Sequence, residues 1–138
     1  MITPEDILEV MGKQVRGICE KVYPQERPNA VTEGLTEFIV VSLPYSVSNK
    51  ILGEDDDWWI DLTVVYEIYV ADKKKASNPK EFNLNKMKPL REQLFATFPV
   101  TDKENRFVIA RPRTVVIASS DGNGYHYTRV QARLTTMV

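Results

Sequence analysis

The chain has 138 residues, 43% hydrophobic and 27% charged, which is the size and composition of one soluble globular domain. Its net charge of −1 argues against a protein whose main task is to grip nucleic acid. A single cysteine, Cys19, excludes an internal disulfide and a cysteine-rich zinc site, and it agrees with a reducing cytoplasm. We predict no signal peptide and no transmembrane segment, because the N-terminus is acidic and no apolar run approaches about 20 residues.

The first predicted element is an amphipathic helix from Pro4 to Val22. Thr3 can cap this helix, Pro4 suits its first turn, and apolar residues then recur at helical spacing. The segment 24–34 that follows is predicted to be a loop, because Pro24 cannot continue the helix.

The longest predicted element is a strand from Trp58 to Ala71. It follows a shorter strand, Leu35 to Leu43, and a polar connection over residues 45–57. Its even-numbered residues are all apolar or aromatic and its odd-numbered residues are mixed, which predicts one buried face and one half-wet face. Such a strand would run about 46 Å, whereas typical strands have about 5–6 residues. We therefore expect it to extend beyond its own core and to contact something else, most simply another copy of the chain.

A loop over residues 72–81 separates the long strand from a second predicted helix, which covers about Leu84 to Phe98. Pro89 is tolerable within this helix if Asn85 caps it, because the proline then lies in the first turn.

The last predicted elements are two strands, the first of which is interrupted. Residues 106–110 and 114–119 are separated by a proline-containing break at 111–113, which indicates a bulge or an edge position. Asp121-Gly122-Asn123-Gly124 predicts a hairpin turn, because both dipeptides favour positive φ. The final strand runs from Tyr125 to Met137.

The order of these elements, α-β-β-α-β-β, predicts one α+β domain over residues 1–138. We expect an antiparallel sheet of four to five strands with two helices packed on one face. These helices would cover the even-numbered side of the long strand.

No residue pattern indicates a particular reaction. We therefore predict a protein that is not an enzyme, with no catalytic, cofactor-binding or metal site. His126 is the only histidine, and Ser119, Ser120 and Asp121 lie near it only across a tight turn, where sequence proximity fixes no geometry. We interpret His126 as a partly exposed strand residue. Cys19 falls on the apolar stripe of the first helix, which favours packing over nucleophilic chemistry.

Two charged runs flank the long strand and should lie at its opposite ends, tens of ångströms apart. The acidic run lacks the spacing of a calcium loop, and the lysine run lacks the interleaved aromatic residues of a nucleic-acid site, so each is also consistent with a solvated loop. If copies stack head to tail, the acidic loop of one approaches the lysine loop of the next. A semi-exposed tryptophan is a further candidate interface anchor. The candidate subunit interface comprises Asp55, Asp56, Asp57, Trp59, Lys73, Lys74 and Lys75.

The succession of an opening helix, a strand, a long alternating strand, a short helix (Asn85 to Phe98) and two closing strands around Asp121–Gly124 covers nearly the whole chain. This order resembles the tail-terminator (tail-completion) and head–tail joining proteins of long-tailed phages. The resemblance implies a non-enzymatic α+β structural subunit of a phage or prophage tail, found in the virion or the host cytoplasm. It also implies a ring, often of six copies, that ends the tail tube and joins it to the head. The implied partners are the chain itself, the tail tube and head–tail connector proteins.

Two other classes of function stay open. A pocket enclosed by the helices and a curved sheet would make a small ligand-binding or enzymatic domain, with Tyr66, Tyr69, Trp59 and His126 as candidate lining residues. An exposed sheet edge would make an adaptor that binds another protein by adding a strand. We expect no membrane partner and no specific nucleic-acid ligand.

Overall fold

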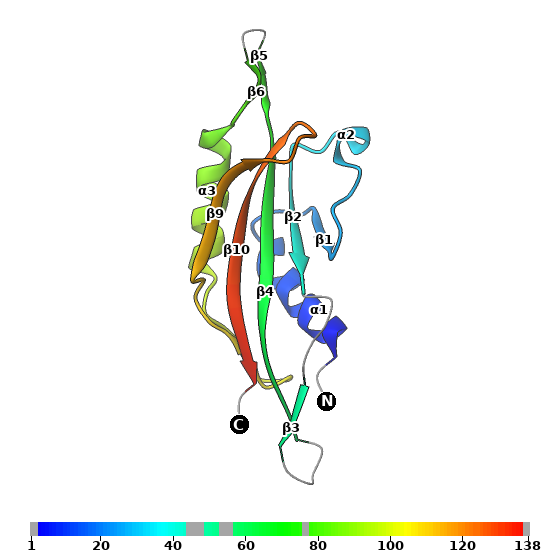
Figure 1. Ribbon diagram of the computed structural model, residues 1–138, viewed down its shortest axis with the longest axis vertical. Helices are drawn as coiled ribbons and strands as arrows, with labels where there is room; N and C mark the ends of the chain where they lie inside the picture. The colour runs from blue at the N-terminus through cyan, green and yellow to red at the C-terminus, as the bar shows by residue number, and fades with distance from the viewer. Residues whose placement is uncertain (1–2, 44–48, 53–56, 76–77, 137–138) are drawn as a thin grey trace.

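The computed structural model describes residues 3–43, 49–52, 57–75 and 78–136. Strand β4 (Asp57–Ala71) has 15 residues and runs along most of a long, narrow molecule (Figure 1). The predicted long strand is therefore confirmed, with one additional residue at its start. Its length sets the long axis of the molecule and places a hairpin at each end.

Eight strands form one mixed sheet in the order β1–β2–β4–β10–β8–β7, in which β3 also pairs with β4 and β9 with β10. Among the described pairs of this sheet, only β1–β2 is parallel. The sheet curls strongly into a half-barrel. Two further strands, β5 (Lys73–Lys75) and β6 (Asn78–Glu81), pair only with each other among the described strands. The other strands are β1 (Val22–Pro24), β2 (Glu37–Ser42), β3 (Asn49–Leu52), β7 (Val100–Asp102), β8 (Phe107–Ile109), β9 (Thr114–Ser120) and β10 (Tyr125–Thr136).

The predicted fold class is wrong. We expected four to five antiparallel strands with two helices on one face, but the chain forms a larger, mixed and mostly β sheet that curls. Strands β1, β3 and β7 have only three or four residues each, which is too few for alternation to show in the sequence. The parallel β1–β2 pair requires a crossover, and the supposed loop supplies it through the one-turn helix α2 (Ala30–Glu33).

Helix α1 (Pro4–Arg16) begins where the sequence predicts and ends earlier. The Asp6 N–H donates to the Thr3 hydroxyl and the Thr3 N–H donates to the Asp6 carboxylate, which is a complete capping box. Gly17 caps the C-terminus, and Val22, predicted to lie in this helix, belongs to β1 instead.

Helix α3 (Leu84–Ala96) contains Pro89 in its interior. The expectation that Asn85 caps the helix is wrong, because Asn85 is its second residue and Asn83 occupies the cap position without a side-chain hydrogen bond. Pro89 is exposed, so the helix lacks one backbone donor on the side that faces water.

The main core lies between the curled sheet and the two longer helices. The even-numbered side chains of β4 from Leu62 to Val70 are buried in it. The Tyr66 hydroxyl donates to Gln14 Oε1 over 2.5 Å, and Gln14 Nε2 donates to Thr97 Oγ1 over 2.8 Å, which ties β4 to α1 and to the end of α3. Around these strand residues pack Ile7, Met11, Val15, Met87, Leu94, Phe107, Ile109, Val130, Ala132 and Leu134.

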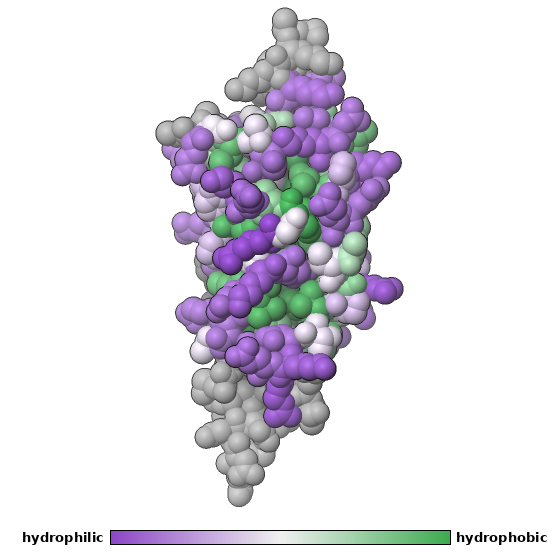
Figure 2. All heavy atoms as spheres, turned by 180° about the vertical axis from the view of Figure 1, so that it is seen from behind, coloured by the Kyte–Doolittle hydropathy of each residue, from purple (hydrophilic) through white to green (hydrophobic). Residues whose placement is uncertain are grey.

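A second, smaller cluster lies on the other face of the sheet, which we call the open face. It consists of Ala30, Phe38, Val40, Tyr69 and Tyr125. Helices α1 and α3 lie behind the sheet in Figure 1, and Figure 2 shows that side from behind, with apolar side chains between charged ones. Near Tyr69 and Val70, β4 is therefore buried on both faces.

Candidate functional site

A hairpin lies at each end of β4, and the two hairpins mark opposite ends of the molecule (Figure 1). At one end β3 pairs with β4, so that Lys50 lies opposite Trp59. At the other end β5 and β6 follow β4, so that Lys73 lies opposite Glu81. At about 3.3 Å per residue, the ends of β4 are roughly 45–50 Å apart.

The candidate interface residues predicted from the sequence divide between these two ends. Within one chain, the described members of the acidic and lysine runs are therefore not brought together. Lys73, Lys74 and Lys75 make up β5, Asp57 and Trp59 lie in β4, and Asp55 and Asp56 lie outside the described residues.

The hairpin segments carry opposite charge in the sequence. Residues 49–57 contain four acidic residues and one lysine, whereas residues 73–81 contain four lysines and one acidic residue. The lysine segment thus lies at the β5–β6 end, whereas of the acidic residues in the other segment only Asp57, at the start of β4, belongs to the described residues.

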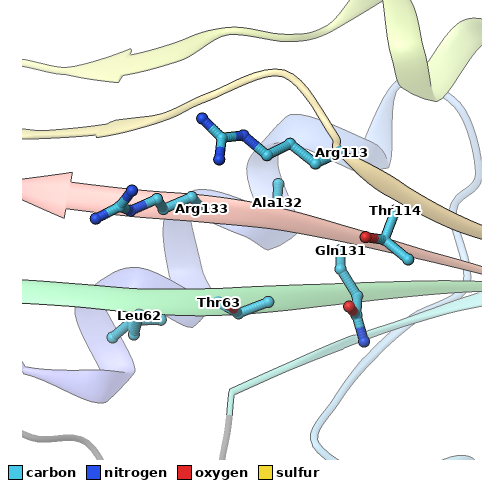
Figure 3. A pocket seen from close by; sticks show the side chains of 7 residues that line it. All are labelled: Leu62, Thr63, Arg113, Thr114, Gln131, Ala132 and Arg133. Atoms are coloured by element: carbon cyan, nitrogen blue, oxygen red, sulfur yellow. The ribbon is translucent and has the colours of Figure 1, made fainter.

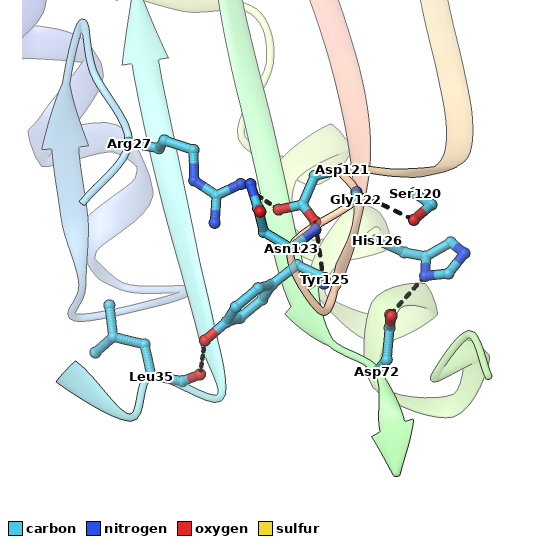
Figure 4. Close-up of polar contacts among 9 residues, drawn as sticks. All are labelled: Arg27, Leu35, Asp72, Ser120, Asp121, Gly122, Asn123, Tyr125 and His126. Atoms are coloured by element: carbon cyan, nitrogen blue, oxygen red, sulfur yellow. Dashed lines mark hydrogen bonds and ion pairs between the residues drawn. The ribbon is translucent and has the colours of Figure 1, made fainter. Parts of the chain in front are cut away.

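A buried Asp–His pair lies where β4 ends and the β5–β6 hairpin begins (Figure 4). His126 Nδ1 lies 2.5 Å from Asp72 Oδ1, and these side chains are only 13% and 2% exposed. The Phe82 ring packs against the imidazole with the ring centroids 5.1 Å apart. Asp72 Oδ2 is buried and has no hydrogen-bond partner among the described residues. The pair ties the start of β10 to the base of the hairpin.

This pair does not involve Ser120 or Asp121, which lie near His126 in the sequence. Ser120 lies opposite His126, but its hydroxyl accepts a hydrogen bond from the Gly122 N–H. Asp121 pairs with Arg27 instead of with the histidine. Sequence reasoning missed Asp72, because no local pattern marks this residue. Its place beside Gly124 follows from the register of β4 with β10.

Arg27 closes the aromatic cluster of the open face. Its guanidinium lies 5.7, 5.0 and 5.6 Å from the ring centroids of Phe38, Tyr69 and Tyr125, and it forms an ion pair with Asp121. Contact of a guanidinium with an aromatic face is favourable. Burial in this cluster raises the pKa of Tyr69 to about 12.

The same aspartate organises the predicted hairpin turn (Figure 4). Asp121 Oδ1 accepts hydrogen bonds from the N–H groups of Asn123 and Tyr125. The Tyr125 hydroxyl donates to the Leu35 carbonyl over 2.5 Å. Gly122 and Gly124 both have positive φ, as the dipeptides predict.

A hollow of about 450 Å³ opens on the sheet face opposite α1 (Figure 3). It lies where β9 and β8 succeed one another along β10, beside the proline-containing break at residues 111–113. Its lining residues are Leu62, Thr63, Arg113, Thr114, Gln131, Ala132 and Arg133. The sequence indicated a bulge or an edge position here but no cavity.

The residues predicted to line a ligand pocket do not converge. Tyr66 lies in the main core, Tyr69 lies on the open face, and His126 pairs with Asp72. The side chain of Trp59 lies outside the described part of the structure. Among the described residues, no group of three or more His, Cys, Asp or Glu side chains could hold a metal ion.

Cys19 is buried in the main core. Burial raises the pKa of its thiol, which disfavours the reactive thiolate. The predicted packing role is therefore confirmed, although Cys19 lies after the end of α1 and not on its apolar stripe.

Comparison with known proteins adds no family, because no family model matches this sequence and none of the curated proteins matches it. None of the described helices is long and apolar enough to cross a membrane.

Proposed function

We propose that this protein is a structural subunit of a phage or prophage tail, which assembles with copies of itself into a ring that ends the tail tube and joins it to the head. The observation that carries the proposal is β4, a 15-residue strand with a hairpin at each end of the molecule. A ring subunit needs two different surfaces, since a head-to-tail contact between unlike surfaces can close into a ring.

The two hairpins supply such unlike surfaces. The β3 end is acidic in sequence and the β5–β6 end is rich in lysine, so contact between the acidic end of one copy and the lysine end of the next is electrostatically complementary. Complementary charge sets orientation and speeds association, whereas like ends repel each other.

The proposal is tested by measuring native mass with light scattering over a concentration series and by negative-stain imaging of any large species. We expect a closed ring of several copies. Replacement of Lys73, Lys74 and Lys75 together by glutamate should abolish the ring and leave a folded monomer. A ring that forms unchanged in this variant would contradict the head-to-tail contact.

A matched control uses three lysines away from the hairpins. Lys13, Lys88 and Lys103 are exposed, so their joint replacement by glutamate changes the net charge equally without touching β5. The control variant should assemble as the unaltered protein does. Equal loss of assembly in both variants would attribute the effect to net charge and would overturn the role of the hairpin.

A second candidate function, an adaptor that binds one partner by strand addition, is favoured by the edge of β9. This seven-residue strand pairs only with β10 among the described strands, so its other edge is open to a further strand. A protein that stays monomeric at every concentration and captures a single partner through β9 would favour this function over the ring.

A further inference from the structure

The hollow beside the break at residues 111–113 is a candidate binding site that the proposed assembly does not use. We propose that it binds a small organic ligand through an oxyanion group, a phosphate or a carboxylate, held by Arg113, with the positive charge of Arg133 beside it. The inference is independent of ring formation, because the hollow lies on the open face of the sheet and not at either hairpin (Figure 3).

The backbone places the two arginines at one hollow. The Arg113 N–H donates to the Gln131 carbonyl over 3.2 Å, and the Ala110 N–H donates to the Arg133 carbonyl over 2.8 Å. Between these two bonds the chain passes through Pro112, which has no N–H to continue the ladder. The break thus sets Arg113 beside Gln131 of β10, and Gln131 lies two residues before Arg133.

The chemistry of the lining matches an oxyanion. Arg113 and Arg133 are both exposed at the hollow, and none of the described residues that line it is acidic. Gln131, Thr63 and Thr114 add an amide and two hydroxyl groups that can donate hydrogen bonds. The planar guanidinium binds carboxylates and phosphates with two parallel hydrogen bonds, which a lysine cannot do.

A neighbouring arginine on the same face shows the contrast. Arg129 makes two hydrogen bonds to Glu67, so its guanidinium is already satisfied within the chain. The Arg113 guanidinium has no such carboxylate partner in the described part of the chain. It is therefore available to a ligand.

The size of the hollow favours a group larger than a bare ion. A volume of about 450 Å³ falls within the roughly 300–1,000 Å³ of small-molecule pockets. Leu62 and Ala132 also line it, although their side chains are buried in the main core.

Calorimetric titration at low ionic strength tests the proposal with four probes: inorganic phosphate, adenosine monophosphate, citrate and adenosine. We expect saturable binding of adenosine monophosphate or citrate, weaker binding of phosphate, and none of adenosine, which lacks the oxyanion. Preference for adenosine monophosphate over citrate assigns a phosphate group, and the reverse assigns a carboxylate. No binding of any anion, or binding of adenosine as tight as that of its phosphate, would overturn the site.

Three variants then locate the binding. R113Q should weaken binding at least about tenfold, because it removes charged hydrogen bonds to the anion, and R133Q, which removes a second positive charge at the hollow, should weaken binding less. R111Q is the matched control: Arg111 is exposed and lies in the same break, but it does not line the hollow. Its affinity should stay within about twofold of the unaltered protein. Equal weakening in all three variants would indicate attraction by net charge alone and would refute the site.

The outcome of these binding measurements does not depend on whether the ring forms. Both variants of the hollow leave the hairpins intact, so R113Q and R133Q should assemble normally if the proposed function is correct. The Lys73, Lys74 and Lys75 replacements should conversely leave anion binding at the hollow in place.

Discussion

The two faces of β4 are stabilised in different ways. On the face turned toward α1 and α3, side chains such as Val64, Tyr66 and Ile68 are buried among apolar residues of two helices and three strands. On the open face, burial is confined to one end, where an arginine closes a small aromatic cluster. Farther along, the same face carries an ion pair and then the arginine-lined hollow.

This difference separates what holds the fold from what is free to bind. The main core excludes water over most of β4, so its energetics are those of close packing. The open face mixes polar, charged and aromatic groups within one sheet surface, and its polar part is accessible to ligands. Substitutions at matched positions on the two faces should therefore differ in magnitude and in kind.

The largest effect is expected in the main core. Ile68→Ala removes a fully buried side chain and should lower the free energy of unfolding by about 2–5 kcal/mol, the range for such cavities. Val65→Ala, a half-buried position on the open face of the same strand, should cost about 1 kcal/mol or less. Urea denaturation measures both. Similar losses at the two positions would contradict the contrast between the faces.

The next effect is expected at the aromatic cluster. Asp121→Ala leaves Arg27 without its carboxylate and two backbone N–H groups without their acceptor, so we expect a loss of about 2–3 kcal/mol. The near-ultraviolet circular dichroism of the tyrosines should weaken as well, because the cluster loosens. An unchanged spectrum with unchanged stability would show that Arg27 does not close the cluster in solution.

Alkaline pH should weaken the open face through Tyr69. Burial raises the pKa of this phenol to about 12, whereas an unfolded tyrosine titrates near pH 10. The unfolded chain therefore loses the proton first, and the stabilisation, complete below about pH 10, declines as the pH rises to 12. We expect a loss of about 2 kcal/mol by pH 12.

Denaturation series at pH 8, 10 and 12 measure this decline. Tyr69→Phe removes the titrating group and should make the decline shallower. Tyr127→Phe, a half-buried tyrosine on the same face, serves as the control and should leave most of the decline in place. Identical pH dependence in the Tyr69 variant and the unaltered protein would assign the alkaline loss to other groups.

The sequence predicted the long or strongly patterned elements and missed those that depend on distant contacts. The capping residues at Thr3, the alternation along β4 and the glycines of the 121–124 turn are local signals, and each has the expected structure. Strands β1, β3 and β7 are too short for a periodic signal, so the sheet was predicted too small and wholly antiparallel.

The candidate sites divide in the same way. The charged runs are visible in the sequence because their residues are adjacent. The Asp72–His126 pair and the hollow, by contrast, join residues that only the register of β4, β9 and β10 brings together. The spacing of residues along the chain carries no trace of such sites.

The smallest predicted effect compares two arginine–carboxylate pairs on one face. Arg129 donates from Nε and Nη2 to Glu67 Oε2 over 3.1 and 2.9 Å, and its hydrogen bond with Glu67 raises the pKa of the guanidinium. The side chains of this pair are 41% and 15% exposed, against 28% and 6% for Arg27 and Asp121. Solvent screening should limit the Arg129–Glu67 coupling energy to below about 1 kcal/mol.

Double-mutant cycles measure both couplings directly, with Arg129→Ala and Glu67→Ala for one pair and Arg27→Ala and Asp121→Ala for the other. The coupling between Arg129 and Glu67 should shrink further in 1 M salt, whereas that between Arg27 and Asp121 should persist, because buried pairs are screened less. Equal couplings with equal salt dependence would mean that burial does not distinguish the two ends of the open face. We instead expect the stronger coupling in the Arg27–Asp121 pair, because aromatic rings cover the Arg27 guanidinium.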